Sequence, residues 1–185
     1  MKNLRTAINQ QRLALSATQK AEFSAAIAQQ LFTLPIFQES TKIACYLDYK
    51  NEVETQAIIE KIWQLNKYCY LPIINSDKTL HFVHYTPQTK LVPNKFGILE
   101  PDLMHATQLD VQQLDLVLTP LVAFNSAFFR VGWGLGHYDR TFSFLLKKIR
   151  PAKPYLIGLA YHFQLNEEIK IEAWDVPLDL IITEK

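Results

Sequence analysis

The sequence predicts an α/β protein with an open, mostly parallel sheet and helices on both faces, a Rossmann-like three-layer sandwich. Short apolar runs suited to buried strands alternate with segments of helical period. A strand, a helix and a second strand follow one another between residues 43 and 73, as in a βαβ unit, which spans about 30 residues. An apolar run over residues 114–124 is typical of an interior strand. We find no repeat and no linker, so we expect a single domain over residues 1–185.

The N-terminal region is predicted to be helical. Ser16 and Gln19 fit a capping box, so a first helix should end near Leu15 and a second should begin near Ala17. Apolar residues then recur at helical spacing until Pro35, which ends the second helix. The elements expected next are a buried strand over 43–47, a helix over 56–66 with Thr55 as its N-cap, and a strand over 68–73.

The second half predicts further strands around one long loop. Residues 80–85 fit a strand at an edge or in a hairpin, and Pro87, Pro93 and Pro101 then punctuate an irregular stretch. A loop this long is more often a binding loop than filler. The remaining elements expected are the central strand over 114–124, a helix over 138–149, and strands over 155–161 and 178–183. Such sheets bind ligands outside the carboxyl ends of their strands, which places candidate site residues after Leu47, Pro72, Phe124 and Leu159.

Composition and charge exclude several classes of partner. Lys and Arg number 19 and Asp and Glu 18, a net charge of +1 that leaves little for binding phosphate backbones, so we expect no nucleic-acid partner. No apolar run approaches the roughly 18 residues of a membrane helix, and the N-terminus does not resemble a signal peptide. Cys45 and Cys69 lie in apolar segments and are expected to be reduced core residues. We therefore expect a cytoplasmic monomer that binds a small-molecule substrate.

A cluster of glycines marks the candidate site. Three of the five glycines, Gly132, Gly134 and Gly136, lie close together between a strand and a helix. Glycine amides can approach an oxyanion closely, and Arg130 and Arg140 could add forked donors to phosphate oxygens. The segment is neither a Walker A loop nor the dinucleotide fingerprint. The alternative is a glycine-rich turn that binds nothing.

These residues resemble a known signature. Pro120 to Phe124, then Arg130-Val131-Gly132 and Gly134-x-Gly136-x-Tyr138-Asp139-Arg140, are similar to the signature of the 5-formyltetrahydrofolate cyclo-ligase family, also called methenyltetrahydrofolate synthetase. The resemblance covers nearly the whole chain. The other matching positions are, in order, Lys2, Leu4, Arg5 and Arg12, Glu52-Val53-Glu54-Thr55, Leu71-Pro72, Phe82, Phe96-Gly97-Ile98-x-Glu100-Pro101, Trp174-Asp175, Leu178-Asp179 and Ile182-Thr183-Glu184.

The resemblance implies an ATP- and Mg²⁺-dependent ligase. Its reaction converts 5-formyltetrahydrofolate to 5,10-methenyltetrahydrofolate, through phosphorylation of the formyl oxygen and attack by N10. Phosphoryl transfer asks a protein chiefly for positioning and charge stabilisation, which a glycine nest and arginines supply. The alternative is a diverged homologue that binds nucleotide or folate with little turnover.

The resemblance also assigns roles to residues. Arg130, Tyr138 and Arg140 would be catalytic. The ATP contacts would be Lys2, Arg5, Arg130, Gly132, Trp133, Gly134, Leu135, Gly136, His137 and Tyr138. The folate contacts would be Leu47, Glu52, Trp133, Gly134, Leu135, Gly136 and His137. Asp139 and Asp175 would hold magnesium, which prefers hard oxygen ligands.

Structural alternatives stand beside the implied roles of four residues. Asp139 could complement a helix dipole, Asp175 could cap a turn, Glu52 could be a solvated loop charge and Tyr138 could be ordinary packing. The chain also departs from the family's usual pattern at three positions. Leu135 replaces glycine or lysine, His137 replaces tyrosine and Phe128 replaces glycine. A leucine at position 135 adds a side chain where a phosphate would approach the backbone.

Overall fold

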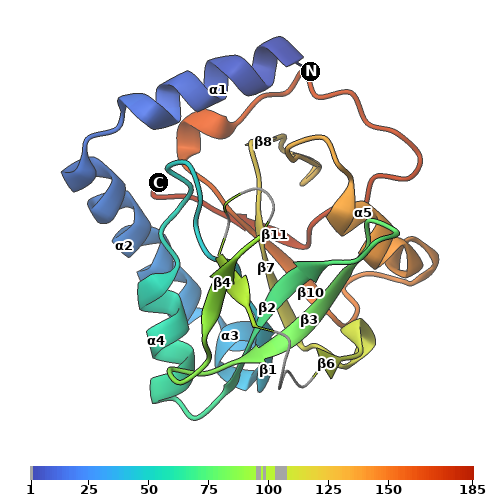
Figure 1. Ribbon diagram of the computed structural model, residues 1–185. Coiled ribbons are helices and arrows are strands. Elements are labelled where there is room, and N and C mark those ends of the chain that lie inside the picture. The colour runs from blue at the N-terminus through green and yellow to red at the C-terminus, as the bar shows by residue number, and fades with distance from the viewer. Residues whose placement is uncertain (1, 95–96, 98, 103–107) are drawn as a thin grey trace.

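A seven-stranded sheet forms the middle layer of the computed structural model, which describes residues 2–94, 97, 99–102 and 108–185 (Figure 1). From one edge to the other, the strands are β11 (Leu180–Ile182), β10 (Tyr155–Leu159), β7 (Leu116–Pro120), β1 (Lys42–Ala44), β2 (Tyr68–Ile74), β3 (Leu80–Tyr85) and β6 (Gln108–Leu109). Neighbours from β11 to β2 are parallel, while β3 pairs antiparallel with both β2 and β6. The mostly parallel sheet is confirmed.

The order of the parallel strands reverses between β1 and β7. From β1 the chain moves to one side to form β2, and it later returns to the other side to form β7, with Ile43 opposite Leu116. Connections leaving adjacent strands in opposite directions open a crevice at their carboxyl ends, which is where open α/β sheets bind ligands. The topology therefore locates a candidate site before any side chain is considered.

Helices α2 (Ala17–Thr33), α3 (Pro35–Glu39) and α4 (Gln56–Gln64) cover one face of the sheet (Figure 1). Ile27 and Ile58 from this layer belong to one core cluster with Ile43 and Leu118 of the strands. The capping box is confirmed: the Ser16 hydroxyl accepts from the amide of Gln19, and the Gln19 side chain accepts from the amide of Ser16. Pro35 follows α2 and is the first residue of α3, where its missing N–H costs nothing.

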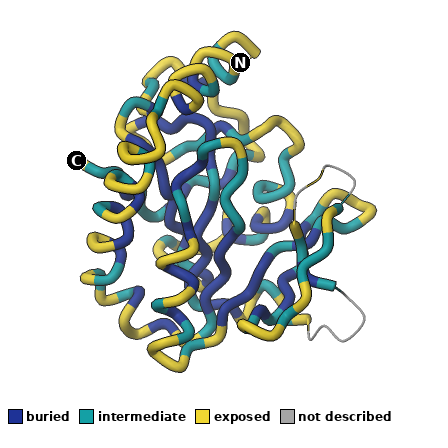
Figure 2. The backbone as a smooth tube through the Cα atoms, turned by 60° about the vertical axis from the view of Figure 1, so that its left-hand side comes forward, coloured by how far each residue is buried: buried dark blue, intermediate teal, exposed yellow. Residues whose placement is uncertain are grey.

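The other face is covered by α5 (His137–Phe142), the 3₁₀ turn η3 (Ser143–Lys147) and the segment before β11. Phe142, Leu145 and Val176 pack there against Ala44 and Val117. Figure 2 shows the buried strands enclosed between these outer segments, which confirms the three-layer α/β prediction. Smaller 3₁₀ turns are η2 (Val111–Gln113) and η4 (His162–Gln164).

Helix α1 (Lys2–Ala14) lies apart from these layers, at the top of Figure 1. Its Ile8 packs in a small cluster with Val122, Ala123 and Val131. The last two belong to a hairpin formed by β8 (Ala123–Phe124) and β9 (Arg130–Val131). None of the described helices has both the length and the apolar character that crossing a bilayer requires.

Several predicted elements are shorter or divided. The strand expected over 43–47 ends as β1 at Ala44, since Tyr46 and Leu47 turn out to line the crevice. The run 114–124 forms both β7 and β8, because the amide of Val122 bonds to Val131 of the hairpin. The helix expected over 138–149 is α5 followed by η3.

Two local predictions about side chains and loops need correction. Thr55 makes no cap bond to α4, because its hydroxyl donates to the carbonyl of Tyr46 at 2.5 Å. The stretch expected to be irregular contains a hairpin of β4 (Leu91–Pro93) and β5 (Leu99–Pro101). Phe96 and Ile98, which contribute to the family resemblance, lie outside the described residues.

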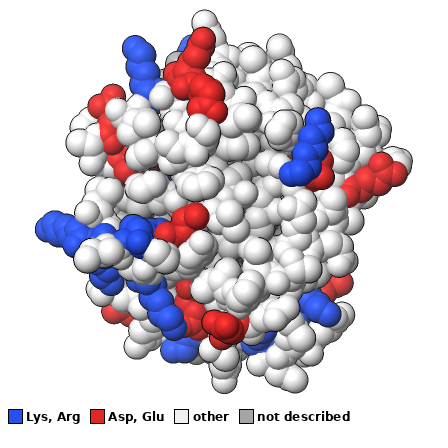
Figure 3. Space-filling view, turned by 180° about the vertical axis from the view of Figure 1, so that it is seen from behind, with Lys and Arg blue, Asp and Glu red and all other residues white. Residues whose placement is uncertain are grey.

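The cysteines and one face of the surface agree with the expectations from composition. Cys45 and Cys69 are both free and buried, and burial raises the pKa of Cys45 to about 12. Seen from behind, acidic and basic side chains are interspersed (Figure 3).

Candidate active site

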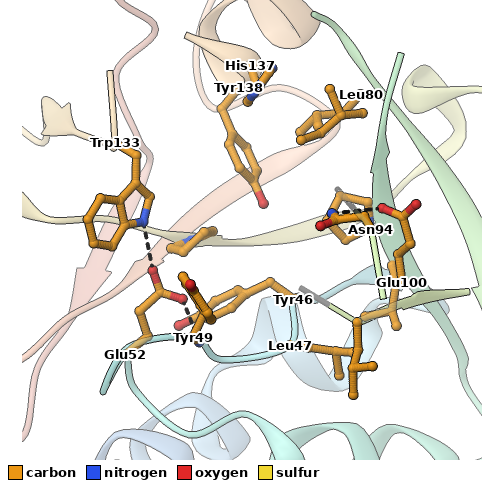
Figure 4. Close-up of a pocket in the computed structure, with 15 residues that line it drawn as sticks. Tyr46, Leu47, Tyr49, Glu52, Leu80, Asn94, Glu100, Trp133, His137 and Tyr138 are labelled. Carbon is orange, nitrogen blue, oxygen red and sulfur yellow. Dashed lines mark hydrogen bonds between the residues drawn. The ribbon is translucent and has the colours of Figure 1, made fainter. Parts of the chain in front are cut away.

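A cavity lies at the carboxyl ends of β1, β2 and β7, where the strand order reverses (Figure 4). Its walls come from the loop after β1, the end of β2, the start of β3, the β4–β5 hairpin, the end of β7 and the glycine loop with the start of α5. The lining residues are Tyr46, Leu47, Tyr49, Glu52, Leu71, Pro72, Ile74, Leu80, Asn94, Leu99, Glu100, Pro120, Trp133, His137 and Tyr138. Most of them are apolar or aromatic, so the few polar groups would orient a ligand.

Glu52 is a buried carboxylate at one side of this cavity, with only 6% of the residue exposed. Its oxygens accept from the amide of Tyr49 at 3.1 Å and from the indole N–H of Trp133 at 3.2 Å. Burial raises the pKa of Glu52, while the guanidinium of Arg12, 3.6 Å away, acts to lower it. The alternative of a solvated loop charge is therefore wrong, since this carboxylate is held inside the protein.

The glycine loop runs from β9 to the start of α5. Gly134 and Gly136 have φ values of +98° and +64°, a region that favours glycine. Arg5 of α1 donates from Nε to the carbonyl of Gly132 at 2.8 Å, and its guanidinium lies against Gly134. Arg140 donates to the carbonyl of Leu135. Two guanidinium groups therefore lie along this loop, an arrangement suited to phosphate oxygens.

Arg130 has a different setting from Arg5 and Arg140. Its side chain is only 4% exposed and pairs with Asp139 at 3.0 Å. Its other branch donates to the carbonyl of Val176 at 2.8 Å, and its guanidinium lies 5.6 Å from the ring centre of Tyr138. Arg130 thus fastens the start of α5 to the segment before β11.

Asp139 and Asp175 are brought into the same neighbourhood. Asp139 accepts through Oδ1 from Arg130 and from the amide of Val176, so the peptide that follows Asp175 lies against it. Asp175 accepts through Oδ2 from the amide of Glu172, so it caps this turn, as the structural alternative for Asp175 expected.

The donor set in this neighbourhood fits magnesium. Among the described residues, the second oxygen of each of these two carboxylates makes no hydrogen bond. No group of three or more metal-ligating side chains occurs in the described part of the chain. Magnesium characteristically uses one or two carboxylates and completes its shell with phosphates and water.

Tyr138 and His137 both border the cavity. The Tyr138 side chain points into it (Figure 4), and burial raises the pKa of Tyr138, so its hydroxyl remains a donor at neutral pH. The Nδ1 of His137 lies 2.7 Å from the carbonyl of Lys78, and since a carbonyl only accepts, Nδ1 carries the proton. The buried Nε2 then has no hydrogen-bond partner among the described residues.

The remaining predicted contacts differ in how they relate to the cavity. Trp133 lines it and joins the glycine loop to the loop after β1 through its bond to Glu52, and Leu47 also lines it. Leu135 is 47% exposed, and Lys2 is exposed at the start of α1. Phe128 has a φ of +64°, the left-handed conformation that favours glycine, which agrees with the glycine that the resemblance led us to expect at this position.

Sequence reasoning gave no role to two features of the site. Arg12 is fully buried and lies beside Glu52, although it is charged. The sequence could have indicated its burial, because Arg12 lies four residues after Ile8 and therefore on the same face of the helix. Asn94 donates to Glu100 at 3.0 Å on the cavity side opposite Glu52 (Figure 4). The contact joins residues on the two sides of a loop, so the sequence offered no signal for it.

Comparison with known proteins settles the family. Residues 1–184 match the sequence model of the 5-formyltetrahydrofolate cyclo-ligase family. The chain belongs to this family. It is 36% identical to the 5-formyltetrahydrofolate cyclo-ligase of Escherichia coli K12 over 178 residues, which cover 95% of this chain and 96% of that protein.

Solved structures of cyclo-ligase relatives share the fold. A 5,10-methenyltetrahydrofolate synthetase from Mycoplasma pneumoniae superimposes with a TM-score of 0.78 at 30% identity, covering all of this chain and 98% of the other. The Aquifex aeolicus 5,10-methenyltetrahydrofolate synthetase gives a TM-score of 0.83, also at 30% identity, over all of this chain and 89% of that one. The resemblance inferred from the glycine loop is confirmed.

Proposed function

We propose that this protein catalyses the ATP-dependent conversion of 5-formyltetrahydrofolate to 5,10-methenyltetrahydrofolate, with Mg²⁺ as the metal cofactor. One observation carries the proposal: a buried carboxylate and a glycine loop flanked by arginines meet across one cavity, joined by the bond from Trp133 to Glu52. The reaction needs a nucleotide and a folate side by side. A cavity with an anion-binding loop on one wall and a buried acceptor on another satisfies that need.

The chemistry explains why phosphate-binding groups are required. A formamide oxygen is a poor leaving group, and transfer of the γ-phosphoryl group to it makes it a good one. The folate N10 then attacks the formyl carbon, and phosphate departs. Arg5 and Arg140, together with the amides of residues 132–136, would hold the phosphate oxygens and offset their charge.

Asp139 and Asp175 would hold the magnesium ion, each through the carboxylate oxygen that makes no hydrogen bond among the described residues. Magnesium would supply neutralising charge for the phosphates. Arg130 would keep Asp139 in place through their ion pair, so we assign it to the same assembly.

Glu52 would recognise the folate ring. A buried carboxylate accepts from N–H groups, and a pterin presents an amino group and ring N–H groups as donors. Leu47 would pack against the ring, and the Tyr138 hydroxyl would donate to reacting oxygens. His137 and Leu135 complete the loop side of the site.

A spectroscopic assay tests the proposal. Mixing the protein with 5-formyltetrahydrofolate, ATP and Mg²⁺ should raise the near-ultraviolet absorbance of the methenyl product, and omitting ATP should abolish the rise. Phe128 and Leu135, which depart from the family pattern, make a binding protein without turnover the second candidate. Calorimetric binding of both ligands with no absorbance rise would favour that candidate.

We place the enzyme in the cytoplasm as a single-domain monomer. The two buried, free cysteines support the cytoplasmic location, since thiols persist in a reducing compartment. Sedimentation of the purified protein would test the oligomeric state.

A further inference from the structure

Three residues on one face of helix α1 contact the rest of the protein at and near the site. Arg5, Ile8 and Arg12 follow at intervals of three and four residues, so their side chains lie on one face of the helix. Ile8 fills the small cluster beside β8 and β9. Arg5 contacts the glycine loop, whereas Arg12 contacts the loop after β1. Helix α1 thus places Arg5 against the glycine loop and Arg12 against the loop after β1.

Arg12 gathers the backbone of a tight turn. It is fully buried, and its guanidinium donates to the carbonyls of Tyr49, Lys50 and Asn51 at 3.1, 2.9 and 3.1 Å. The amide side chain of Asn51 donates back to the carbonyl of Arg12 at 2.9 Å. Three carbonyls that converge on one planar, forked donor require a residue with the geometry of arginine.

The turn held by Arg12 has a strained backbone. Lys50 and Asn51 both have left-handed conformations, with φ values of +48° and +56°, although neither is glycine. Residues in this region cost free energy and persist when surrounding contacts enforce them. The guanidinium of Arg12 supplies those contacts from inside the turn.

Glu52 follows this turn directly. Its carboxylate lies 3.6 Å from Arg12 and accepts from the amide of Tyr49, the first residue of the turn. The same guanidinium lies 5.7 Å from the ring centre of Trp133, which also donates to Glu52. The orientation of the Glu52 carboxylate therefore depends on a turn that Arg12 holds.

We propose that Arg12 is a positioning residue for folate recognition, which fixes the turn at residues 49–51 and thereby aims Glu52 at the cavity. The inference rests on the proposed role of Glu52 as the folate acceptor. Arg12 lies behind the carboxylate and is not among the residues that line the cavity. Its effect is exerted through Glu52, and it should be visible in folate binding.

The test compares Arg12→Lys with Arg5→Lys, two conservative changes on the same helix face. Lysine keeps the charge but cannot donate to three converging carbonyls. Loss of charge-assisted hydrogen bonds should raise the KM for 5-formyltetrahydrofolate about tenfold in Arg12→Lys, with the KM for ATP changed less than about twofold. Arg5→Lys should show the reverse pattern.

A double-mutant cycle separates positioning from general destabilisation. Glu52→Gln should raise the folate KM by itself, and adding Arg12→Lys to it should raise that KM by no more than about twofold. Asn51→Ala loosens the same turn by removing the bond from the Asn51 side chain to the carbonyl of Arg12, and it should raise the folate KM about threefold even if Arg12→Lys fails to fold.

The outcomes are distinct. The inference would be overturned if the effects of Arg12→Lys and Glu52→Gln on the folate KM were additive. It would also be overturned if Arg12→Lys changed the two KM values equally. Neither outcome would affect the proposed function. Unchanged folate KM in Asn51→Ala would likewise overturn the inference alone. An unchanged folate KM in Glu52→Gln would overturn the proposed role of Glu52, and the inference would fall with it.

Discussion

The guanidinium of Arg5 occupies the space in which a side chain at Gly134 would begin. A Cβ atom built on Gly134 would lie 3.1 Å from Nη2 of Arg5 and 3.2 Å from its Cζ. The residue also has a φ of +98°, which L-residues with a side chain rarely adopt. The backbone conformation therefore favours glycine at this position, and the missing side chain leaves room for the guanidinium of Arg5, which donates to the carbonyl of Gly132.

Replacing Gly134 with alanine should both destabilise the protein and weaken its use of ATP. The left-handed backbone should cost about 1 kcal/mol of unfolding free energy or more, and the new methyl group should displace Arg5. Gly132→Ala is the matched control for stability, because no atom lies within 4 Å of its Cβ position and its φ is not left-handed. Thermal melts and ATP kinetics check this expectation. Equal melting temperatures for the two variants would contradict it.

Arg130 and Arg140 should respond differently to replacement by alanine. Arg140 is exposed, so its loss should raise the KM for ATP about tenfold and leave the melting temperature nearly unchanged. Arg130 is buried against Asp139, so its loss should lower the unfolding free energy by about 2 kcal/mol. Denaturant titration of both variants beside ATP kinetics provides the comparison. If Arg140→Ala is strongly destabilised, the main role of Arg140 is to stabilise the loop rather than to bind ATP.

Asp139→Asn and Asp175→Asn should each raise the Mg²⁺ concentration required for half-maximal activity. Asparagine retains the shape of aspartate but removes the charge that a hard cation prefers. Asp139→Asn should also lose stability through its contact with Arg130, whereas Asp175→Asn should keep most of its turn bond. Asp110→Asn is the control, because Asp110 caps a distant 3₁₀ turn that asparagine caps equally well. If both variants need the same Mg²⁺ concentration as the parent for half-maximal activity, the two carboxylates have only a structural role.

Apolar runs in the sequence predicted a mostly parallel sheet, and the glycine cluster indicated a candidate site. Strands that are buried on both faces appear in the sequence as continuous apolar runs, so the parallel strands could be recognised. The end of β1 could not, because Tyr46 and Leu47 are as apolar in a cavity wall as they would be in a strand. An apolar pattern indicates that a residue is buried, but it does not indicate whether a helix or a ligand covers that residue.

Contacts between distant segments account for the other differences. Thr55 looked like a helix cap from its local sequence, but its hydroxyl reaches the carbonyl of Tyr46 instead. Arg12 received no role from the sequence, and only the fold places three carbonyls around it. Such pairings depend on how loops converge, which no local pattern encodes. The roles assigned to the site residues stay predictions.

The stability of the protein should fall in acid through Asp115. Burial alone would raise the pKa of Asp115, but the bond from Lys153 and those from the amides of Lys42 and Thr41 outweigh it and lower the pKa to about 2. A depressed pKa stabilises the folded state above the unfolded value, near 3.9, and this contribution disappears as the pH falls from about 4 to about 2. Asp115→Asn should be less stable than the parent at pH 7 and should lose less stability over that interval. Parallel acid titrations of parent and variant, followed by circular dichroism, would contradict this assignment if the curves kept a constant separation.

Leu135→Gly should leave ATP binding nearly unchanged and should lower stability. The leucine lies between Gly134 and Gly136, yet 47% of it is exposed and its carbonyl accepts from Arg140, so its side chain does not fill the loop. Glycine adds freedom to the unfolded chain, which should cost about 1 kcal/mol of unfolding free energy. Calorimetric titration with ATP beside a thermal melt measures both quantities. A clear gain in affinity would mean that the leucine obstructs the phosphates, and a clear loss without unfolding would mean that Leu135 itself contacts the nucleotide.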